Sequence, residues 1–193
     1  MPCGATITLV PSRLTALDSS FLHLEDQGAH MHIAALLLFD GQAPPYEEIC
    51  RSLEHRLSQA PRYRQRLAPV PFGQGRPCWV DDTHFNIHYH VRHTAVPAPG
   101  GERQIQDLCA RLLGQRLDRH RPLWEMWVIE GLEDGGFAIF TKSHHALADG
   151  VSGMDIIALL LSLDPADRAP HGDPSWQPEP APSGVDMLAD ALR

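Results

Sequence analysis

Apolar side chains recur at helical spacing in several segments of the chain. They are clearest in residues 102–118, where apolar positions three or four apart would line one face of a helix. Residues 15–24 predict a shorter helix by the same spacing. Two further helices are expected, over residues 44–60 and 151–163.

Other apolar segments have the length and composition of strands. The segments expected as strands are residues 31–39, 85–92, 123–129 and 137–142. A Gly-rich turn at residues 134–136 predicts that the last two form a hairpin. Helices interleaved with strands, together with a hairpin, favour an α/β sandwich with a mixed sheet over a strictly doubly wound fold.

The composition changes after this patterned region. Residues 1–163 are expected to form one domain, whereas residues 164–182 contain six of the 17 prolines and predict an extended linker. Ser183 and Asp186 then resemble a helix-capping box, so residues 183–193 predict the start of another helix. A linker that leads into a new helix suggests a second domain after it.

Charge and composition exclude some classes of protein. The 193 residues carry a formal charge of −8 and are 43% hydrophobic, which argues against disorder and against broad nucleic-acid binding. No apolar run approaches the roughly 20 residues that span a bilayer. The four cysteines form no CxxC pair, which indicates a reducing compartment, and Cys78 is expected to be the most exposed of them.

Several polar clusters allow more than one interpretation. Arg62, Arg64 and Arg66 alternate in a segment that predicts either a solvated loop or edge strand, or a contact for an anionic ligand. His88 and His90 would share a strand face, and with His93 they suggest a metal site, although the spacing is incomplete as a zinc signature. His30 and His32 are interpreted in the same way.

The strongest candidate for chemistry is the pair His144-His145, followed by Asp149-Gly150, between a predicted strand and a predicted helix. Three interpretations are open. The segment could be a capped structural turn, since Asp is a common N-cap. It could present a histidine general base. It could also hold a metal ion, although adjacent histidines on a strand point to opposite faces.

The string His144-His145-x-x-x-Asp149-Gly150 resembles the HHxxxDG motif of CoA-dependent acyltransferases. The wider sequence is similar to the wax ester synthase/diacylglycerol acyltransferase family, in the segments 14–21, 31–33, 89–93, 121–125 and 142–150. This resemblance implies a chloramphenicol acetyltransferase-like α/β fold, with a mixed-sheet sandwich as one of two pseudo-equivalent halves. The chain would then represent the N-terminal half.

The same resemblance implies roles for individual residues. His145 would be the general base that accepts the proton of an alcohol, and His144 would support it. Asp149 would hold the loop and Gly150 would keep the channel open. Pro122, Leu123 and Trp124 would line the substrate tunnel, although Leu123 and Trp124 on a strand are more often core residues than ligand contacts.

The activity implied is transfer of a fatty acyl group from acyl-CoA to diacylglycerol or a long-chain alcohol, with acyl-CoA as substrate and neither a cofactor nor a metal. The alternatives are a condensation domain that depends on carrier proteins, and a non-catalytic assembly domain. Expected partners are the C-terminal half of the same enzyme, a membrane or lipid-droplet surface and a second copy of the chain, with no nucleic acid. The expected location is the cytoplasm, at the periphery of membranes or lipid inclusions.

Overall fold

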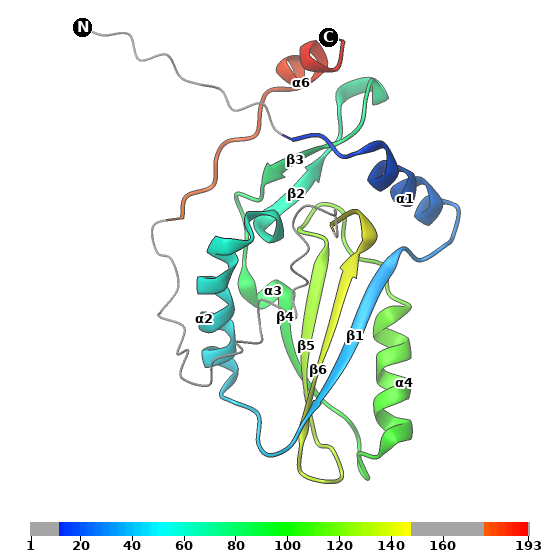
Figure 1. Ribbon diagram of the computed structural model, residues 1–193, viewed down its shortest axis with the longest axis vertical. Coiled ribbons are helices and arrows are strands. Elements are labelled where there is room, and N and C mark those ends of the chain that lie inside the picture. The colour runs from blue at the N-terminus through cyan, green and yellow to red at the C-terminus, as the bar shows by residue number, and fades with distance from the viewer. Residues whose placement is uncertain (1–11, 148–175, 193) are drawn as a thin grey trace, which may run out of the picture.

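The computed structural model describes residues 12–147 and 176–192 (Figure 1). A four-stranded sheet with the order β1-β6-β5-β4 runs through the described part of the chain. Its strands are β1 (His32–Phe39), β4 (Val91–Ala95), β5 (Trp124–Glu130) and β6 (Phe137–His144). β6 pairs antiparallel with β1 and β5, and β4 pairs parallel with β5. The expected mixed sheet and β5–β6 hairpin are therefore confirmed.

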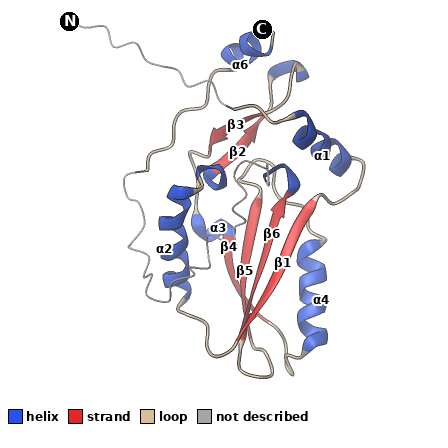
Figure 2. Cartoon of the chain, in the orientation of Figure 1, coloured by secondary structure: helices blue, strands red, loops and turns tan. Residues whose placement is uncertain are grey.

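Helices cover both faces of this sheet, and a small second sheet lies at one end (Figure 2). The helices are α1 (Ala16–Asp26), α2 (Tyr46–Arg56), α3 (Ile87–His90), α4 (Glu102–Leu113) and α6 (Gly184–Ala191). The small sheet pairs β2 (Gln65–Ala68) with β3 (Cys78–Asp81). Short 3-10 turns span Leu57–Gln59, Pro61–Arg64, Pro71–Gly73 and His145–Leu147, the last being η4.

The two faces of the sheet build two hydrophobic clusters, because alternate residues of a strand point to opposite sides. On one face, α4 packs Ile105 and Leu108 against Ile129 and Phe140. The other cluster includes the α2 residues Cys50 and Leu53 and the β5 residues Met126 and Val128, whereas α1 contributes Leu22.

Lys142 ties the end of α4 to β6. Its ammonium group is completely buried and donates to the carbonyls of Leu112 and Gln115, each at 2.9 Å. These carbonyls lie at the carboxyl end of the helix, where the helix dipole favours a positive charge. The carboxylate of Glu125 lies 3.5 Å from the same ammonium. Burial lowers the pKa of Lys142, and Glu125 opposes that shift.

The structure corrects three of the sequence predictions. Residues 85–92 do not form one strand, because the Asn86 side chain accepts from the His88 amide and begins the short helix α3 before β4. Cys78 is not exposed, because it lies within β3 with only 1% of its surface accessible. The α4 helix ends at Leu113 rather than continuing to residue 118.

The alternating arginines are also not a simply solvated segment. Arg64 is buried and donates to the carbonyl of Glu54 at 2.6 Å. Arg62 lies over the ring of Trp79, with 4.8 Å from its guanidinium carbon to the ring centre. Arg62 and Arg64 thus contribute to packing around the small sheet.

The described end of the chain packs against the first domain. Trp176 lies under the guanidinium of Arg64 at 4.8 Å, and Arg13 pairs with Asp190 of α6 at 2.7 Å. Ser183 accepts from the Asp186 amide and caps α6, as predicted. The helix expected over residues 151–163, and the linker as far as residue 175, lie outside the described residues.

Candidate active site

The two motif histidines occupy the point where β6 ends and the η4 turn begins. The amide of His144 donates to the carbonyl of Leu123 at 3.0 Å, and the amide of His145 donates to that of Met31 at 2.9 Å. The pair is thereby held between the start of β5 and the residue before β1. In Figure 1 this end of β6 points toward α1, and the Phe21 ring of α1 lies 5.0 Å from the His145 ring.

The two histidines differ sharply in their surroundings. His144 is fully buried, whereas His145 is only partly buried. The amide N–H of Ala146 donates to Nδ1 of His144 at 3.0 Å. An acceptor nitrogen carries no proton, so the remaining proton of the neutral ring lies on Nε2. Burial also lowers the pKa of His144, against the attraction of the Glu25 charge. His145 is therefore the more accessible histidine of the pair.

Behind His144 lies a cluster of charged and polar side chains that we call the Glu25 cluster, made of Glu25, His32, Arg119 and His144. Glu25, near the end of α1, is 2% exposed. Its Oε2 accepts from Arg119 Nη2 at 2.7 Å and from Arg119 Nε at 3.0 Å. Nε2 of His32 lies 3.2 Å from Oε1, and Nε2 of His144 lies 3.7 Å from Oε2. Burial lowers the pKa of His32 as well, so burial disfavours the charged form of both imidazoles.

Glu25 and Arg119 were not among the site residues expected from the sequence. The signal available for Glu25 was its spacing, three residues after Leu22 on the inner face of α1. A carboxylate on an apolar helical face is rarely buried unless it is paired. The sequence does not show its partner, because Arg119 lies 94 residues further along the chain.

The three residues Pro122, Leu123 and Trp124 lie in the core at the start of β5. Leu123 and Trp124 have no exposed surface. The Trp124 indole stacks on His90 with 4.7 Å between ring centres and donates to the carbonyl of Tyr63 at 2.8 Å. This packing agrees with the core interpretation of these positions. Asp149 and Gly150 lie outside the described residues.

The histidines suggested as metal ligands do not converge. His90 is buried against Trp124, whereas His88 lies beside Tyr46, with 3.2 Å from its Nδ1 to the hydroxyl. The sequence predicted that His88 and His90 share a strand face, but both lie in the short helix α3. His93 pairs with Glu130 at 3.1 Å. Within residues 12–147 and 176–192, no group of three His, Cys, Asp or Glu side chains could hold a metal ion.

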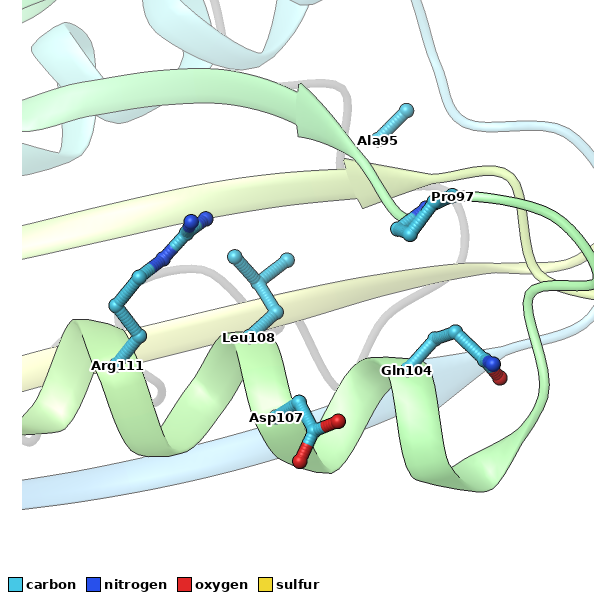
Figure 3. A pocket seen from close by; sticks show the side chains of 6 residues that line it. All are labelled: Ala95, Pro97, Gln104, Asp107, Leu108 and Arg111. Atoms are coloured by element: carbon cyan, nitrogen blue, oxygen red, sulfur yellow. The ribbon is translucent and has the colours of Figure 1, made fainter.

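A surface pocket lies at the opposite end of the sheet, between α4 and the end of β4 (Figure 3). It is lined by Ala95, Pro97, Gln104, Asp107, Leu108 and Arg111. Its volume of about 210 Å³ is below the roughly 300–1,000 Å³ of typical ligand sites. We do not assign the acyl or alcohol site to it. Among the described helices, none is long and apolar enough to cross a membrane.

The fold of the chain is similar to those of an acyltransferase and of condensation domains. The starter condensation domain of rhizomide synthetase matches 78% of the chain with a TM-score of 0.62 at 13% identity, a likeness of fold alone. The wax ester synthase/diacylglycerol acyltransferase from Marinobacter aquaeolei VT8 matches 74% of the chain with a TM-score of 0.62 at 36% identity. The mixed sheet and these neighbours confirm the chloramphenicol acetyltransferase-like fold class.

The chain belongs to the wax ester synthase/diacylglycerol acyltransferase family, whose catalytic-domain model matches residues 14–192. A Mycobacterium tuberculosis protein named probable diacylglycerol O-acyltransferase tgs3 is 40% identical over 185 residues, which are 94% of this chain and 67% of that protein. Another, tgs1, is 47% identical over 158 residues, covering 81% and 34%. The chain also spans 36% of the Marinobacter enzyme, so it corresponds to about a third of these two relatives.

Proposed function

We propose that this chain carries the general base of an O-acyltransferase that moves a fatty acyl group from acyl-CoA to the hydroxyl of diacylglycerol or a long-chain alcohol. Membership of the family supports the reaction class. The observation that carries the assignment is the contrast within the motif. His144 is fully buried with Nδ1 occupied, whereas His145 is partly exposed at the end of the sheet.

In the proposed reaction, a ring nitrogen of His145 accepts the proton of the acceptor hydroxyl while its oxygen attacks the thioester carbonyl. The tetrahedral intermediate then collapses, the carbon–sulfur bond breaks, and the CoA thiolate recovers the proton from the imidazolium. The products are an ester and free CoA thiol, so neither a cofactor nor a metal is needed. A positioned base of this kind is worth about 10²–10⁴ in rate.

The remaining parts of the site are also proposals. Asp149 and Gly150 would shape the loop after His145, and Pro122, Leu123 and Trp124 would support the tunnel wall from the core. The chain covers only about a third of two of its relatives, which supports the proposal that a C-terminal half of the enzyme completes the channel. Diacylglycerol and long-chain alcohols are lipids, so we propose a cytoplasmic enzyme at the periphery of a membrane or lipid inclusion. A second copy of the chain could also associate with it.

The test measures free-thiol release from palmitoyl-CoA, with and without dioleoylglycerol or hexadecanol. We expect acceptor-dependent release that falls at least about a hundredfold in His145→Ala. His23→Ala, on the exposed side of α1, is the matched control and should retain the rate. Equal acceptor-dependent release by His145→Ala and the unaltered chain would contradict the assignment of the base.

A further inference from the structure

Arg119 fixes the position of the Glu25 carboxylate independently of the two histidines of the Glu25 cluster. Two of the three donor nitrogens of Arg119, Nη2 and Nε, reach the same oxygen, Oε2, at 2.7 and 3.0 Å. Nη2 of Arg119 also donates to the carbonyl of Leu22 at 2.9 Å, one turn earlier in α1. Charge-assisted hydrogen bonds of this kind are among the stronger ones in proteins. The oxygen that faces His144 therefore has a defined position.

The other side of the His144 ring is fixed by the backbone. Its Nδ1 accepts from the Ala146 amide at 3.0 Å, so the proton lies on Nε2, and Nε2 points at Glu25 Oε2 from 3.7 Å. That separation is longer than a direct hydrogen bond, but the negative oxygen still favours a proton on the nitrogen that faces it. The opposite tautomer would turn the Nδ1 proton against the Ala146 N–H. A single ring tautomer is thus compatible with both neighbours.

The amide that contacts His144 belongs to the residue directly after His145. The amide of His145 itself is held by the carbonyl of Met31 at 2.9 Å. The peptide groups on both sides of His145 are consequently fixed, one by the chain before β1 and one by the His144 ring. A change of the His144 tautomer would remove the second contact and release the η4 turn.

This arrangement is poorly explained by stability alone. In the described part of the chain, the buried atoms Glu25 Oε1 and His144 Nε2 have no hydrogen bond of good geometry. Incompletely satisfied buried polar groups cost free energy, and an apolar cluster of the same shape would avoid that cost. Such exceptions are a reason to look for a functional role.

We propose that Glu25 is a positioning residue for the acyl transfer proposed above: its carboxylate keeps His144 in the Nε2–H tautomer, and His144 in turn fixes the backbone turn that carries His145. The kinetic consequence rests on the proposed function. The tautomer itself rests on the geometry of Glu25, His144 and Ala146, and it can be measured without any substrate.

The first test is nitrogen-15 NMR of the histidine rings at pH 7, with His144→Gln used to identify the His144 signals. We expect unaltered protein to show His144 as the Nε2–H tautomer and Glu25→Gln to show a shift toward a mixture. The matched control is Asp26→Asn, because Asp26 is an exposed neighbour that pairs with the same arginine at 2.9 Å. A charged or Nδ1–H His144 in the unaltered protein, or an unchanged tautomer in Glu25→Gln, would overturn the inference.

The second test separates kcat from KM in the thiol-release assay. Glu25→Gln should lower kcat about a hundredfold, as a misplacement of about 1 Å does, and leave KM within about twofold. Asp26→Asn should retain both values. A tautomer shift without a fall in kcat would refute the positioning role, whereas acceptor-dependent turnover that persists in His145→Ala would refute the proposed function instead. If thermal melting shows Glu25→Gln to be unfolded, Glu25→Asp replaces it: this variant keeps the buried charge but draws the carboxylate back from His144 by one methylene group, and a tautomer and kcat identical to those of the unaltered protein would then count against the inference.

Discussion

His90 should make the stability of this domain depend on pH in a calculable way. The ring is 1% exposed, its Nδ1–H donates to the Trp124 carbonyl at 2.9 Å, and it stacks between Phe85 and Trp124. Burial lowers its pKa from 6.5 to about 4, and only part of this is offset by the hydrogen bond and by Asp82. The folded protein therefore holds His90 neutral at a pH where the unfolded chain protonates it.

The sign follows from counting protons. Between pH 6.5 and about 4 the unfolded state binds the additional proton, so the free energy of unfolding falls as the pH falls through this window. Each pH unit contributes up to about 1.4 kcal/mol, which gives about 3 kcal/mol over the window for one fully buried ring. Above pH 6.5 and below pH 4 this contribution is constant.

The assay compares urea unfolding of the unaltered protein and of His90→Phe from pH 4 to pH 7.5. At pH 7.5 the variant should be about 1–3 kcal/mol less stable, because the Trp124 carbonyl loses its buried partner. By pH 4 this difference in the free energy of unfolding should vanish or reverse, because phenylalanine at position 90 takes up no proton in the unfolded state. His120→Gln, in an exposed turn, is the matched control, and its free energy of unfolding should differ from that of the unaltered protein by the same amount at every pH. A gap for His90→Phe that does not change with pH would refute the reasoning.

Two further substitutions test the packing around the candidate site. Lys142→Met leaves Glu125 and two helix-end carbonyls without their buried cation, so we expect a loss of about 3–5 kcal/mol. For a domain of this size that corresponds to a fall in Tm of about 6–20 °C, and adding Glu125→Gln should restore part of it. Trp124→Phe should cost about 1–3 kcal/mol in denaturant unfolding, because the Tyr63 carbonyl loses its donor. Trp127→Phe, at a less buried position, should cost less, and an equal cost in the two variants would contradict the core role of Trp124.

Elements with a long regular pattern could be predicted from the sequence, and those set by a single local contact could not. The amphipathic spacing of α4 and the apolar run of β6 follow from burial in the two core clusters, whereas the apolar run of β1 predicts the strand although Ile33, Leu36 and Leu38 are exposed. The strand predicted over residues 85–92 failed because one hydrogen bond from the Asn86 side chain begins a helical turn. An alternating pattern of apolar and polar residues over eight positions gives no sign of a side-chain cap of this kind. Cys78 was misplaced because Gly and Pro around it suggested a loop, whereas pairing with β2 buries it.

The candidate site shows the same division. The histidine pair and its place between a strand and a turn were visible in the sequence, because they are contiguous. The Glu25 cluster was not, because it joins α1, the start of β1, the segment before β5 and the end of β6. Ion pairs that close over such separations depend on the three-dimensional fold. Spacing along one element cannot predict them.

The adjacency of His144 and His145 has a physical reason beyond the motif itself. On a strand, successive side chains point to opposite faces, and His144 follows Lys142 toward the side where α4 ends. If β6 continued, His145 would simply enter the other core cluster. Instead the strand stops at His144 and the chain turns into η4, so His145 leaves the sheet at its end, beside Phe21. The buried ring of His144 accepts a hydrogen bond from the amide of Ala146, the residue directly after His145. His144 thus holds the turn that directs His145 outward, and exchanging His144 for a residue without a ring nitrogen should disturb the position of His145 as well.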